Sequence, residues 1–315
     1  MVLIFALQLV VPLLFVGWIG FVPTRSILGF CIQVVGVAVA LLAVGLIGLW
    51  LLPPWWTPWV FGGLLLAAVV AGWWRRSPFI SKFPSGWMAW LSTGVFTTVG
   101  GWGSYQAMIA IDGRLPQQGP VVDLAFPLKG GEFLIVNGGS SIVLNAHLMT
   151  LDTSAKRFQA YRGQSYGIDI VKINSWGLRA DGVLPPRPSA YFIYGSRVYA
   201  PCTGEVIAAF DGVQDMQIPR MDREHMAGNY VMLRCEQADV LLGHLQSGSV
   251  SVTFHQPVSV GQIIAKVGNS GNTGEPHLHI HAQRAGTASA PLSGAPLPSR
   301  FGGRFLLRND RISSP

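Results

Sequence analysis

Long uncharged apolar runs dominate the first third of the chain. Met1–Phe21 and Ile27–Leu52 contain no charged residue and are rich in Leu, Val and Phe. A helix needs about 20 apolar residues to cross a bilayer core, so both runs predict membrane spans. Trp59–Trp74 is shorter, but tryptophans at both ends resemble interfacial aromatic belts, and we expect a third span there. Trp87–Ala110 is uncharged but contains several Ser, Thr and Gly residues. It is either a fourth span or an interfacial segment.

From Leu115 onward the pattern changes to short β-branched or aromatic runs separated by Gly, Pro and Asp, which is typical of strands. No segment beyond this point has a helical period over 11 residues. Connections too short for helical crossovers favour antiparallel pairing. The expected strands are Phe133–Val136, Ser141–Leu144, Gly167–Val171, Arg197–Ala200, Glu205–Phe210, Tyr230–Cys235, Val240–His244, Gln262–Val267 and His277–Ala282. The predicted fold is an α-helical transmembrane region over residues 1–114, followed by a mainly-β, largely antiparallel domain over 115–315.

The charge distribution supports this division. Half of the residues are hydrophobic (50%) and only 12% are charged, against about a quarter in soluble proteins. The charged residues lie almost entirely beyond residue 114, where 17 Lys and Arg accompany 14 Asp and Glu. This near balance excludes a strongly basic nucleic-acid-binding surface. The three cysteines are too few for a disulfide-dense mini-protein.

The few basic residues of the first region predict its topology. Arg25 lies between the first two apolar runs, and Arg75, Arg76 and Lys82 lie between the last two. The positive-inside rule places both connections in the cytoplasm, so a true fourth span delivers the β domain to the outer face. A cleaved signal peptide fits poorly, because the first run has no basic n-region and no small-residue cleavage site. A buried helical bundle in a soluble protein is the other alternative.

All the histidines of the chain lie in the β domain. Three of them alternate in Pro276–His281, directly after a turn-rich segment. Residues two apart share a face of a strand, so His277, His279 and His281 can present three imidazoles side by side. This spacing suits a metal ligand next to a catalytic imidazole, although surface or hydrogen-bonded histidines give the same pattern. The seven are His147, His225, His244, His255, His277, His279 and His281.

Val267–His279, with the sequence VGNSGNTGEPHLH, resembles the terminal motif of lysostaphin-type zinc endopeptidases. Further segments follow in that family's order, and the resemblance covers about Gly163 to Gln283. It implies a β-rich fold, one Zn²⁺ ion and hydrolysis of peptide bonds in bacterial peptidoglycan. The further segments are Val198–Val206, Gly228–Leu233, Gly243–Leu245 and Val258–Gln262.

The resemblance also assigns roles to residues. It implies that Asp169 and His279 are zinc ligands, and that His244 and His277 are catalytic histidines that orient and deprotonate a water molecule or stabilise the developing oxyanion. Two imidazoles and a carboxylate leave a fourth zinc position open, as catalytic zinc sites require. The family expects the second imidazole four residues before the aspartate, where this chain has Ser165. A serine hydroxyl is a poor zinc ligand, so either the site is degenerate or another histidine replaces it.

His147 is the first candidate for this replacement. A variant branch of the family is similar in having an Asn-x-His segment upstream, as in Asn145–His147, and Gln-x-Tyr before the aspartate, as in Gln164–Tyr166. The alternative is a strand-end histidine bonded to backbone. The second candidate is His225, in the long polar connection 211–228, which is of a kind that often walls a site. We expect His255 to be solvated, and His281 to be either a partner behind a ligand or simply exposed.

The cysteines allow a geometric prediction. If Phe210 pairs with Asn229 in antiparallel strands, Cys235 faces Gly204, two residues from Cys202. A disulfide is then geometrically possible, and two free thiols are the alternative. Cys31, in the second apolar run, is expected to be a small packing residue.

Three functions remain open. The first is a membrane-anchored zinc metalloendopeptidase in the bacterial inner membrane, multi-pass, with its peptidase domain on the periplasmic or extracellular side. Its partners would be peptidoglycan or a peptide substrate and the lipid bilayer, with no nucleic acid. The second is a metal-free degenerate relative that binds and regulates another cell-wall hydrolase. The third is a transporter or signalling protein with a sensing β domain. The apolar runs contain no charged residue, which speaks against transport.

Overall fold

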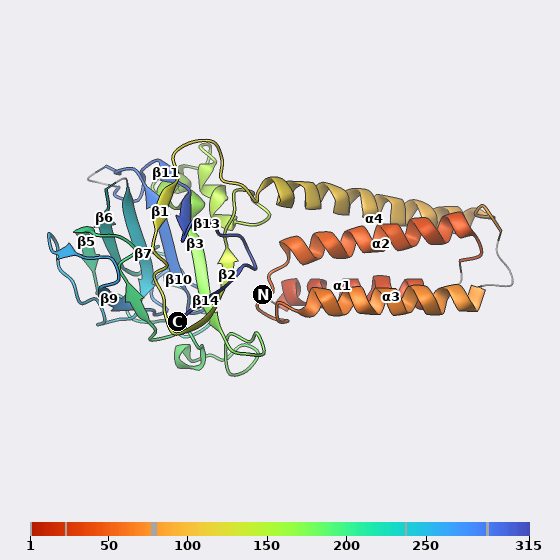
Figure 1. The fold of residues 1–315 in the computed structure, drawn as a ribbon, viewed down its shortest axis with the longest axis horizontal. Helices are drawn as coiled ribbons and strands as arrows, with labels where there is room; N and C mark the ends of the chain where they lie inside the picture. The colour runs from red at the N-terminus through yellow and green to blue at the C-terminus, as the bar shows by residue number, and fades with distance from the viewer. Residues whose placement is uncertain (1, 23, 77–80, 237, 288–289) are drawn as a thin grey trace. The chain divides into compact units, whose positions relative to one another are not determined.

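The computed structural model describes residues 2–22, 24–76, 81–236, 238–287 and 290–315. The chain divides into two compact units, Met1–Ile111 and Asp112–Pro315. The first consists of helices and the second is built mainly from strands (Figure 1).

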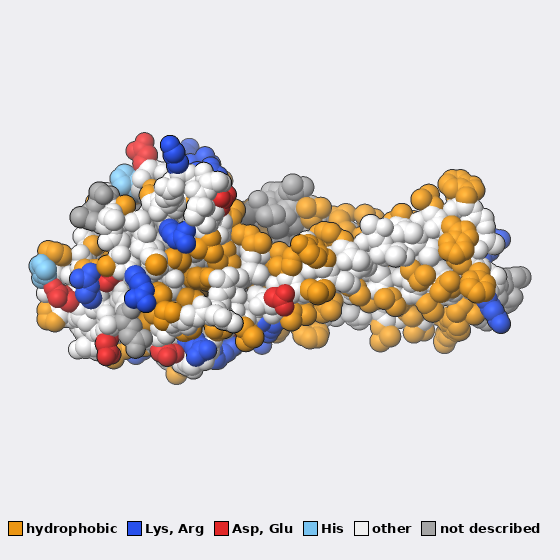
Figure 2. All heavy atoms as spheres, turned by 90° about the horizontal axis from the view of Figure 1, so that it is seen from above, with side chains coloured by type: hydrophobic (Ala, Val, Ile, Leu, Met, Phe, Trp, Pro, Cys, Tyr) orange, Lys and Arg blue, Asp and Glu red, His pale blue; other side chains and the backbone are white. Residues whose placement is uncertain are grey.

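All four apolar runs are helical. The helices are α1 (Val2–Phe21), α2 (Ile27–Ile47), α3 (Thr57–Arg76) and α4 (Trp87–Asp112). The second helix ends five residues earlier than expected, because Gly48 caps it and its N–H bonds to the carbonyl of Val44. Among the described residues, Ile27–Ile47 and Thr57–Arg75 are long and apolar enough to span a membrane, and Leu7–Phe21 is a shorter apolar helix. Hydrophobic side chains cover much of the surface of this unit (Figure 2).

A buried glutamine links three of these helices. Gln33 of α2 accepts hydrogen bonds from Trp18 Nε1 of α1 (3.1 Å) and from Thr24 Oγ1 (2.9 Å), and it donates to Ser92 Oγ of α4 (3.3 Å). Helices α2 and α4 also approach closely at Gly36, where an added Cβ would clash with the carbonyl oxygen of Phe96. The fourth helix is therefore packed as part of the bundle, although it is less apolar than α2.

The second unit is built around a largely antiparallel nine-stranded sheet. Its strand order is β14-β2-β3-β10-β7-β6-β5-β8, and β11 pairs with β10. The strands are β2 (Gly131–Asn137), β3 (Ile168–Ile173), β5 (Gly204–Phe210), β6 (Asn229–Arg234), β7 (Asp239–Leu245), β8 (Pro257–Val258), β10 (Leu278–Gln283), β11 (Pro296–Leu297) and β14 (Arg311–Ser314). Two small sheets accompany it, namely β4 (Arg197–Tyr199) with β9 (Ile263–Lys266), and β1 (Val122–Leu124), β12 (Ser299–Phe301) and β13 (Arg304–Phe305).

Eight of the nine expected strands are present, and the prediction of a strand over Ser141–Leu144 is wrong. That segment is a turn, in which the N–H of Leu144 bonds back to the carbonyl of Ser141, and a short 3₁₀ helix η1 (Ala146–Leu151) follows. His147 therefore lies in a 3₁₀ helix rather than at a strand end. The antiparallel prediction has one exception, since β1 pairs with β12 in parallel.

No long helix occurs in the described part of the second unit. Its helical segments after η1 are α5 (Lys156–Gln159) and the 3₁₀ helices η2 (Arg162–Tyr166) and η3 (Pro188–Ala190).

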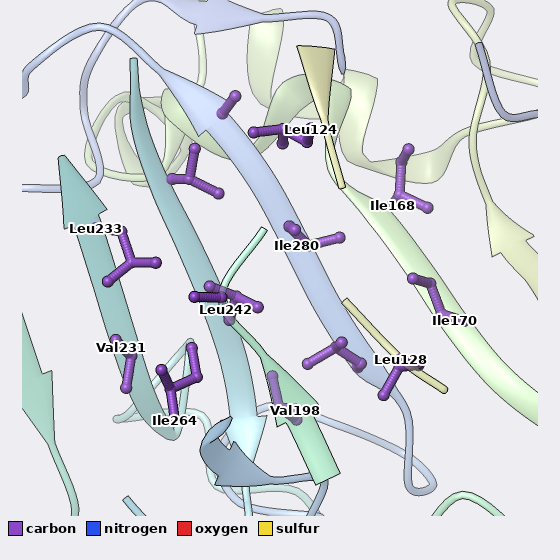
Figure 3. Close-up of a cluster of buried hydrophobic side chains, with 14 of the residues drawn as sticks. Leu124, Leu128, Ile168, Ile170, Val198, Val231, Leu233, Leu242, Ile264 and Ile280 are labelled. Carbon is purple, nitrogen blue, oxygen red and sulfur yellow. The ribbon is translucent and has the colours of Figure 1, made fainter. Parts of the chain in front are cut away.

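One face of the large sheet carries the hydrophobic core. Ile168 and Ile170 of β3 and Ile280 of β10 pack in one cluster with Val198 of β4 and Ile264 of β9 (Figure 3). Burying one such side chain contributes about 1.5–3 kcal/mol to folding. Because side chains alternate between the two faces of a strand, fixing these residues in the core directs the residues between them to the other face.

A disulfide joins Cys202 to Cys235 across the end of the β5–β6 pair, with a Cα–Cα distance of 6.0 Å. The predicted register holds at this end, where Glu205 faces Arg234. At the other end the prediction is wrong, because Phe210 pairs with Tyr230 rather than Asn229. A β-bulge between Val206 and Ala208 shifts the register by one residue.

Candidate metal centre

Asp169 and His279 form the centre of the site. They are direct cross-strand partners in β3 and β10, on the face opposite the core. His279 Nδ1 lies 2.8 Å from Asp169 Oδ1, and their side chains are only 4% and 7% exposed. Gly167 leaves space for the imidazole, since a Cβ at this position would lie 2.5 Å from His279 Cε1. The core alternation and one glycine thus bring a carboxylate and an imidazole together out of water.

The 3₁₀ helix η1 brings His147 to the same carboxylate. Its Nε2 lies 2.9 Å from Asp169 Oδ2. Asn145 caps this helix by accepting from the N–H of His147 (3.1 Å), and its amide donates to the carbonyl of Gly167 (3.0 Å), directly before β3. The cap therefore fixes the helix that carries one imidazole relative to the strand that carries the carboxylate.

Ser165 plays a different part from the histidine expected in its place. Its hydroxyl is fully buried and lies 2.8 Å from Thr150 Oγ1, which in turn lies 2.8 Å from the carbonyl oxygen of His147. Ser165 also bonds to the carbonyl of Arg162 (2.6 Å). Ser165 thus links η2 to η1 by hydrogen bonds and supports the backbone of His147.

The backbone of β7 changes course at His244. By simple alternation after Val240 and Leu242, which lie in the core, this side chain would also point into the core. His244 instead has φ +59°, and the β6–β7 register shifts between Asn229 and Val231. A β-bulge with a residue in the left-handed region re-aims the side chain at a cost of about 1–3 kcal/mol, and such strain clusters at functional sites. The ring centroid of His244 consequently lies 5.9 Å from that of His279.

Backbone carbonyls fix the tautomers of His244 and His277. His244 Nδ1 lies 2.9 Å from the carbonyl oxygen of Ser270, and His277 Nδ1 lies 2.9 Å from that of Glu275. A carbonyl oxygen only accepts, so each Nδ1 carries a hydrogen and each Nε2 is left to exchange a proton. The two ring centroids are 4.7 Å apart. His277 Nε2 also lies 3.5 Å from Asp169 Oδ1, beside the central carboxylate.

The charges of these groups follow from burial and from one another. Burial alone would raise the pKa of Asp169, but His147 and His277 hold that pKa well below its usual range. Burial lowers the pKa of His279, and it holds the pKa of His244 well below the usual histidine value, with a further contribution from His277. Burial also disfavours the charged form of His277, but the Asp169 carboxylate overcomes this and raises its pKa. The site therefore combines an anionic carboxylate with two neutral imidazoles and one that binds a proton more readily.

His281 lies behind His279. It is 2% exposed, and its Nδ1 lies 2.9 Å from His279 Nε2. Of the two expectations for this residue, exposure is wrong and a place behind a candidate ligand is confirmed. Burial holds the pKa of His281 well below the usual value, so this contact is between two neutral rings.

Two histidines lie apart from this cluster. His225 Nδ1 bonds to Asp222 Oδ2 at 2.7 Å, and its side chain is 49% exposed. His255 is also exposed and pairs with Glu205. The candidate metal-binding group found among the described residues contains neither of them.

His147, Asp169 and His279 could together bind a metal ion. Their ligand atoms all lie within 4.8 Å of one another. Imidazole nitrogens and a carboxylate oxygen are the donors that zinc accepts in catalytic sites. The group of three candidate ligands contains neither His244 nor His277, whose Nδ1 atoms bond to backbone carbonyls.

Sequence comparison connects this geometry with known proteins. Residues 191–291 match Peptidase family M23. This part of the chain is an M23 peptidase domain. The matched segment of the M23 domain includes His244, His277 and His279, whereas His147 and Asp169 precede it. M23 enzymes are cell-wall peptidases, so the family implies peptide-bond hydrolysis.

Two solved structures illustrate the similarity of the M23 domain. A zinc containing peptidase from Vibrio cholerae is 29% identical, over 30% of this chain and 24% of that one, with a TM-score of 0.23. The catalytic domain of the antimicrobial peptidase lysostaphin from Staphylococcus simulans is 21% identical, over 40% of this chain and 71% of that one, with a TM-score of 0.26. The chain thus covers about a quarter of the first protein. No match was found among curated proteins.

Proposed function

We propose that the chain is a membrane-anchored zinc metalloendopeptidase that hydrolyses peptide bonds in peptidoglycan. The observation that carries this proposal is the convergence of His147, Asp169 and His279 beside His244 and His277. A metal site with two further histidines at its edge has the parts that hydrolysis needs, namely ligands and groups that exchange protons.

The donor set fits zinc. In our proposal His147, Asp169 and His279 are the ligands, and His147 replaces the histidine that is absent at Ser165. Zinc bound there would polarise a water molecule and the peptide carbonyl. The side chains of His147 and His277 are 19% and 15% exposed, whereas that of His279 is 4% exposed, so these two imidazoles lie nearer to solvent than His279 does.

The two remaining histidines have complementary proton chemistry. His244 is buried with a lowered pKa, so its free Nε2 is a neutral proton acceptor at pH 7. His277 lies beside Asp169 with a raised pKa, so it holds a proton more readily and can donate it to a leaving amine. Groups whose environments push their pKa values apart are suited to act as base and acid in one reaction.

Residues 1–114 form the membrane anchor in this proposal, and residues 115–315 form the peptidase. In this proposal Arg25 and the Arg75–Lys82 connection lie on the cytoplasmic side, as the positive-inside rule expects, and the peptidase faces the periplasm or the cell exterior of a bacterium. The Cys202–Cys235 disulfide supports this side of the membrane, because disulfides persist in oxidising compartments.

The full-length protein in detergent tests the proposal. We expect about one zinc ion per chain, and cleavage of peptidoglycan that stops on chelation and returns when zinc is added. A chain that stays metal-free and inert in the presence of zinc would contradict it. That result would favour the alternative, a degenerate relative that binds and regulates another cell-wall hydrolase.

A further inference from the structure

A side-chain amide supports the central carboxylate from the strand next to it. Asn137, at the end of β2, donates from Nδ2 to Asp169 Oδ2 at 2.7 Å. The same oxygen lies 2.9 Å from His147 Nε2. One oxygen of the candidate ligand is therefore held by an amide, which does not titrate.

A bulge in β2 brings Asn137 to this position. Ile135 faces Ile170 across the β2–β3 pair, but the next paired residues are Asn137 and Asp169, so Val136 is the extra residue. By regular alternation, Asn137 would share the core face with Phe133 and Ile135. The bulge instead sets it directly opposite Asp169, and bulges are known to re-aim side chains in this way.

Arg308 determines which end of the amide faces the carboxylate. Its Nη2 donates to Asn137 Oδ1 at 3.0 Å, and the N–H of Ala146 donates to the same oxygen at 3.3 Å. Both groups are donors only, so they bind the amide oxygen and leave the NH₂ group for Asp169. If the amide were flipped, Asn137 Oδ1 would face the Asp169 carboxylate oxygen, and its NH₂ group would face the N–H donors of Arg308 and Ala146.

Other hydrogen bonds of Arg308 hold the guanidinium in place. Its Nε donates to the carbonyl of Val136 at 3.0 Å, and its Nη1 donates to the carbonyl of Val143 at 2.9 Å. These bonds connect the bulge of β2 with the turn before η1. The planar guanidinium suits this arrangement, whereas a lysine would supply a single point of charge.

We infer that Asn137 and Arg308 are positioning residues for the metal site, with Arg308 orienting the Asn137 amide and Asn137 holding Asp169 for coordination. This inference rests on the proposed function, because it assumes that Asp169 is a ligand. Both residues lie outside the 191–291 segment that matches the M23 family. Partners of this kind typically contribute about 10- to 100-fold in metal affinity.

The test measures zinc affinity by competition with a chromogenic chelator, and the cobalt absorption spectrum, on the full-length protein in detergent. Asn137→Ala should weaken zinc binding by about 10- to 100-fold and alter the cobalt bands. Asn137→Asp keeps an acceptor for Arg308 but turns an oxygen toward Asp169, so it should weaken binding at least as much. Arg308→Lys keeps the positive charge but loses the planar guanidinium with its several N–H donors, so it should also weaken zinc binding.

The double variant tests whether Arg308 acts through Asn137. Adding Arg308→Lys to Asn137→Ala should change zinc affinity by no more than about twofold, since residues in one network are not additive. Asn174→Ala is a matched control, because Asn174 Oδ1 also accepts two hydrogen bonds, in this case from the backbone N–H groups of Trp176 and Leu178. It should leave zinc affinity and the cobalt spectrum unchanged.

Each outcome bears on the inference. If the unmodified protein binds one zinc and Asn137→Ala binds it equally well with the same cobalt spectrum, the inference is overturned and the proposed function stands. Fully additive losses would overturn the coupling of Arg308 to Asn137. A protein that binds no zinc in any form would refute the proposed function and this inference together.

Discussion

His279 Nδ1 lies 2.8 Å from Asp169 Oδ1, between residues that face each other directly across β3 and β10. Neighbouring strands hold such a pair at a distance set by the sheet rather than by a loop. The contact is also buried, which strengthens the interaction of the carboxylate with any cation that the site binds. Removing either partner should therefore affect metal binding more than removing a histidine at the edge.

The first prediction separates the proposed ligands from the proposed catalytic histidines. Asp169→Ala and His279→Ala should each abolish stable zinc binding, because each removes a coordinating atom. His277→Ala should retain zinc with an affinity lowered by no more than about 10- to 100-fold, while hydrolysis is lost. Zinc content after dialysis, together with peptidoglycan cleavage, measures both effects. Full zinc occupancy in the Asp169 variant would refute the ligand assignment.

The second prediction concerns the departure from the family at Ser165. His147→Ala should lose zinc and activity, because it removes a ligand. Ser165→Ala should keep zinc binding nearly intact and cost about 1 kcal/mol of stability, the usual worth of a buried hydroxyl hydrogen bond. The activity of the two variants should differ by at least about 100-fold. Equal zinc content and equal cleavage rates would rule out His147 as a ligand.

The third prediction uses the close approach of Gly167 to His279. A methyl group at position 167 would lie 2.5 Å from His279 Cε1, so Gly167→Ala should displace the imidazole and weaken zinc binding. The backbone angles of Gly167, φ −60° and ψ 147°, suit alanine, but the added Cβ would also lie 2.8 Å from the carbonyl oxygen of Gln164, so the end of η2 must shift as well. Gly182→Ala is a contrasting control, because nothing lies within 4 Å of its Cβ position, although its φ of +113° costs stability. Unchanged zinc affinity in Gly167→Ala would show that the ring can move without loss.

Regular alternation made much of this site predictable from sequence. The pattern of β10 correctly placed His279 and His281 on one face, and the apolar neighbours of Asp169 direct its side chain to that same face. These positions follow from the hydrophobic core, which a sequence pattern shows directly.

The family resemblance, rather than the strand pattern, named His244, and Asn137 was not named at all, because alternation alone does not show irregularities of single residues. His244 and Asn137 reach the site because a bulge in their own strand reverses the direction of their side chains. The hydrophobic pattern of the neighbouring strand does not show where such an extra residue lies. The turn before η1 was predicted as a strand because Ile142, Val143 and Leu144 are apolar. The Gly138–Gly139 pair just before them was the signal for a turn.

The fourth prediction concerns topology. If Arg25 and the Arg75–Lys82 connection are cytoplasmic and α4 crosses the bilayer, a reporter fused at residue 120 lies outside the cytoplasm. A phosphatase fusion there should be active, and a cytoplasm-dependent fluorescent fusion should be dark. The reverse pattern would overturn the predicted side of the peptidase domain.

The last prediction is the pH dependence of stability in the metal-free protein. Burial holds the pKa of His244 and His281 well below the unfolded value of about 6.5. As the pH falls below about 6.5, the unfolded chain binds protons at these positions and the folded chain does not, so stability decreases. His277 has a raised pKa and acts in the opposite direction, but it is one group against three, since burial also lowers the pKa of His279.

This effect is measured by unfolding the protein in urea with a chelator present, at pH 7 and at pH 5. Proteolysis of the β-rich unit reports the extent of unfolding. One proton changes the free energy of unfolding by at most about 1.4 kcal/mol per pH unit. His281→Gln keeps a donor for His279 Nε2 and removes one titrating group, so this variant should lose less stability than the unmodified protein between the two pH values. Its stability would then decrease mainly through His244 and His279. An identical pH dependence in both proteins would mean that His281 has the same pKa in the folded and unfolded chains. That result would contradict the pKa expected from its burial beside His279.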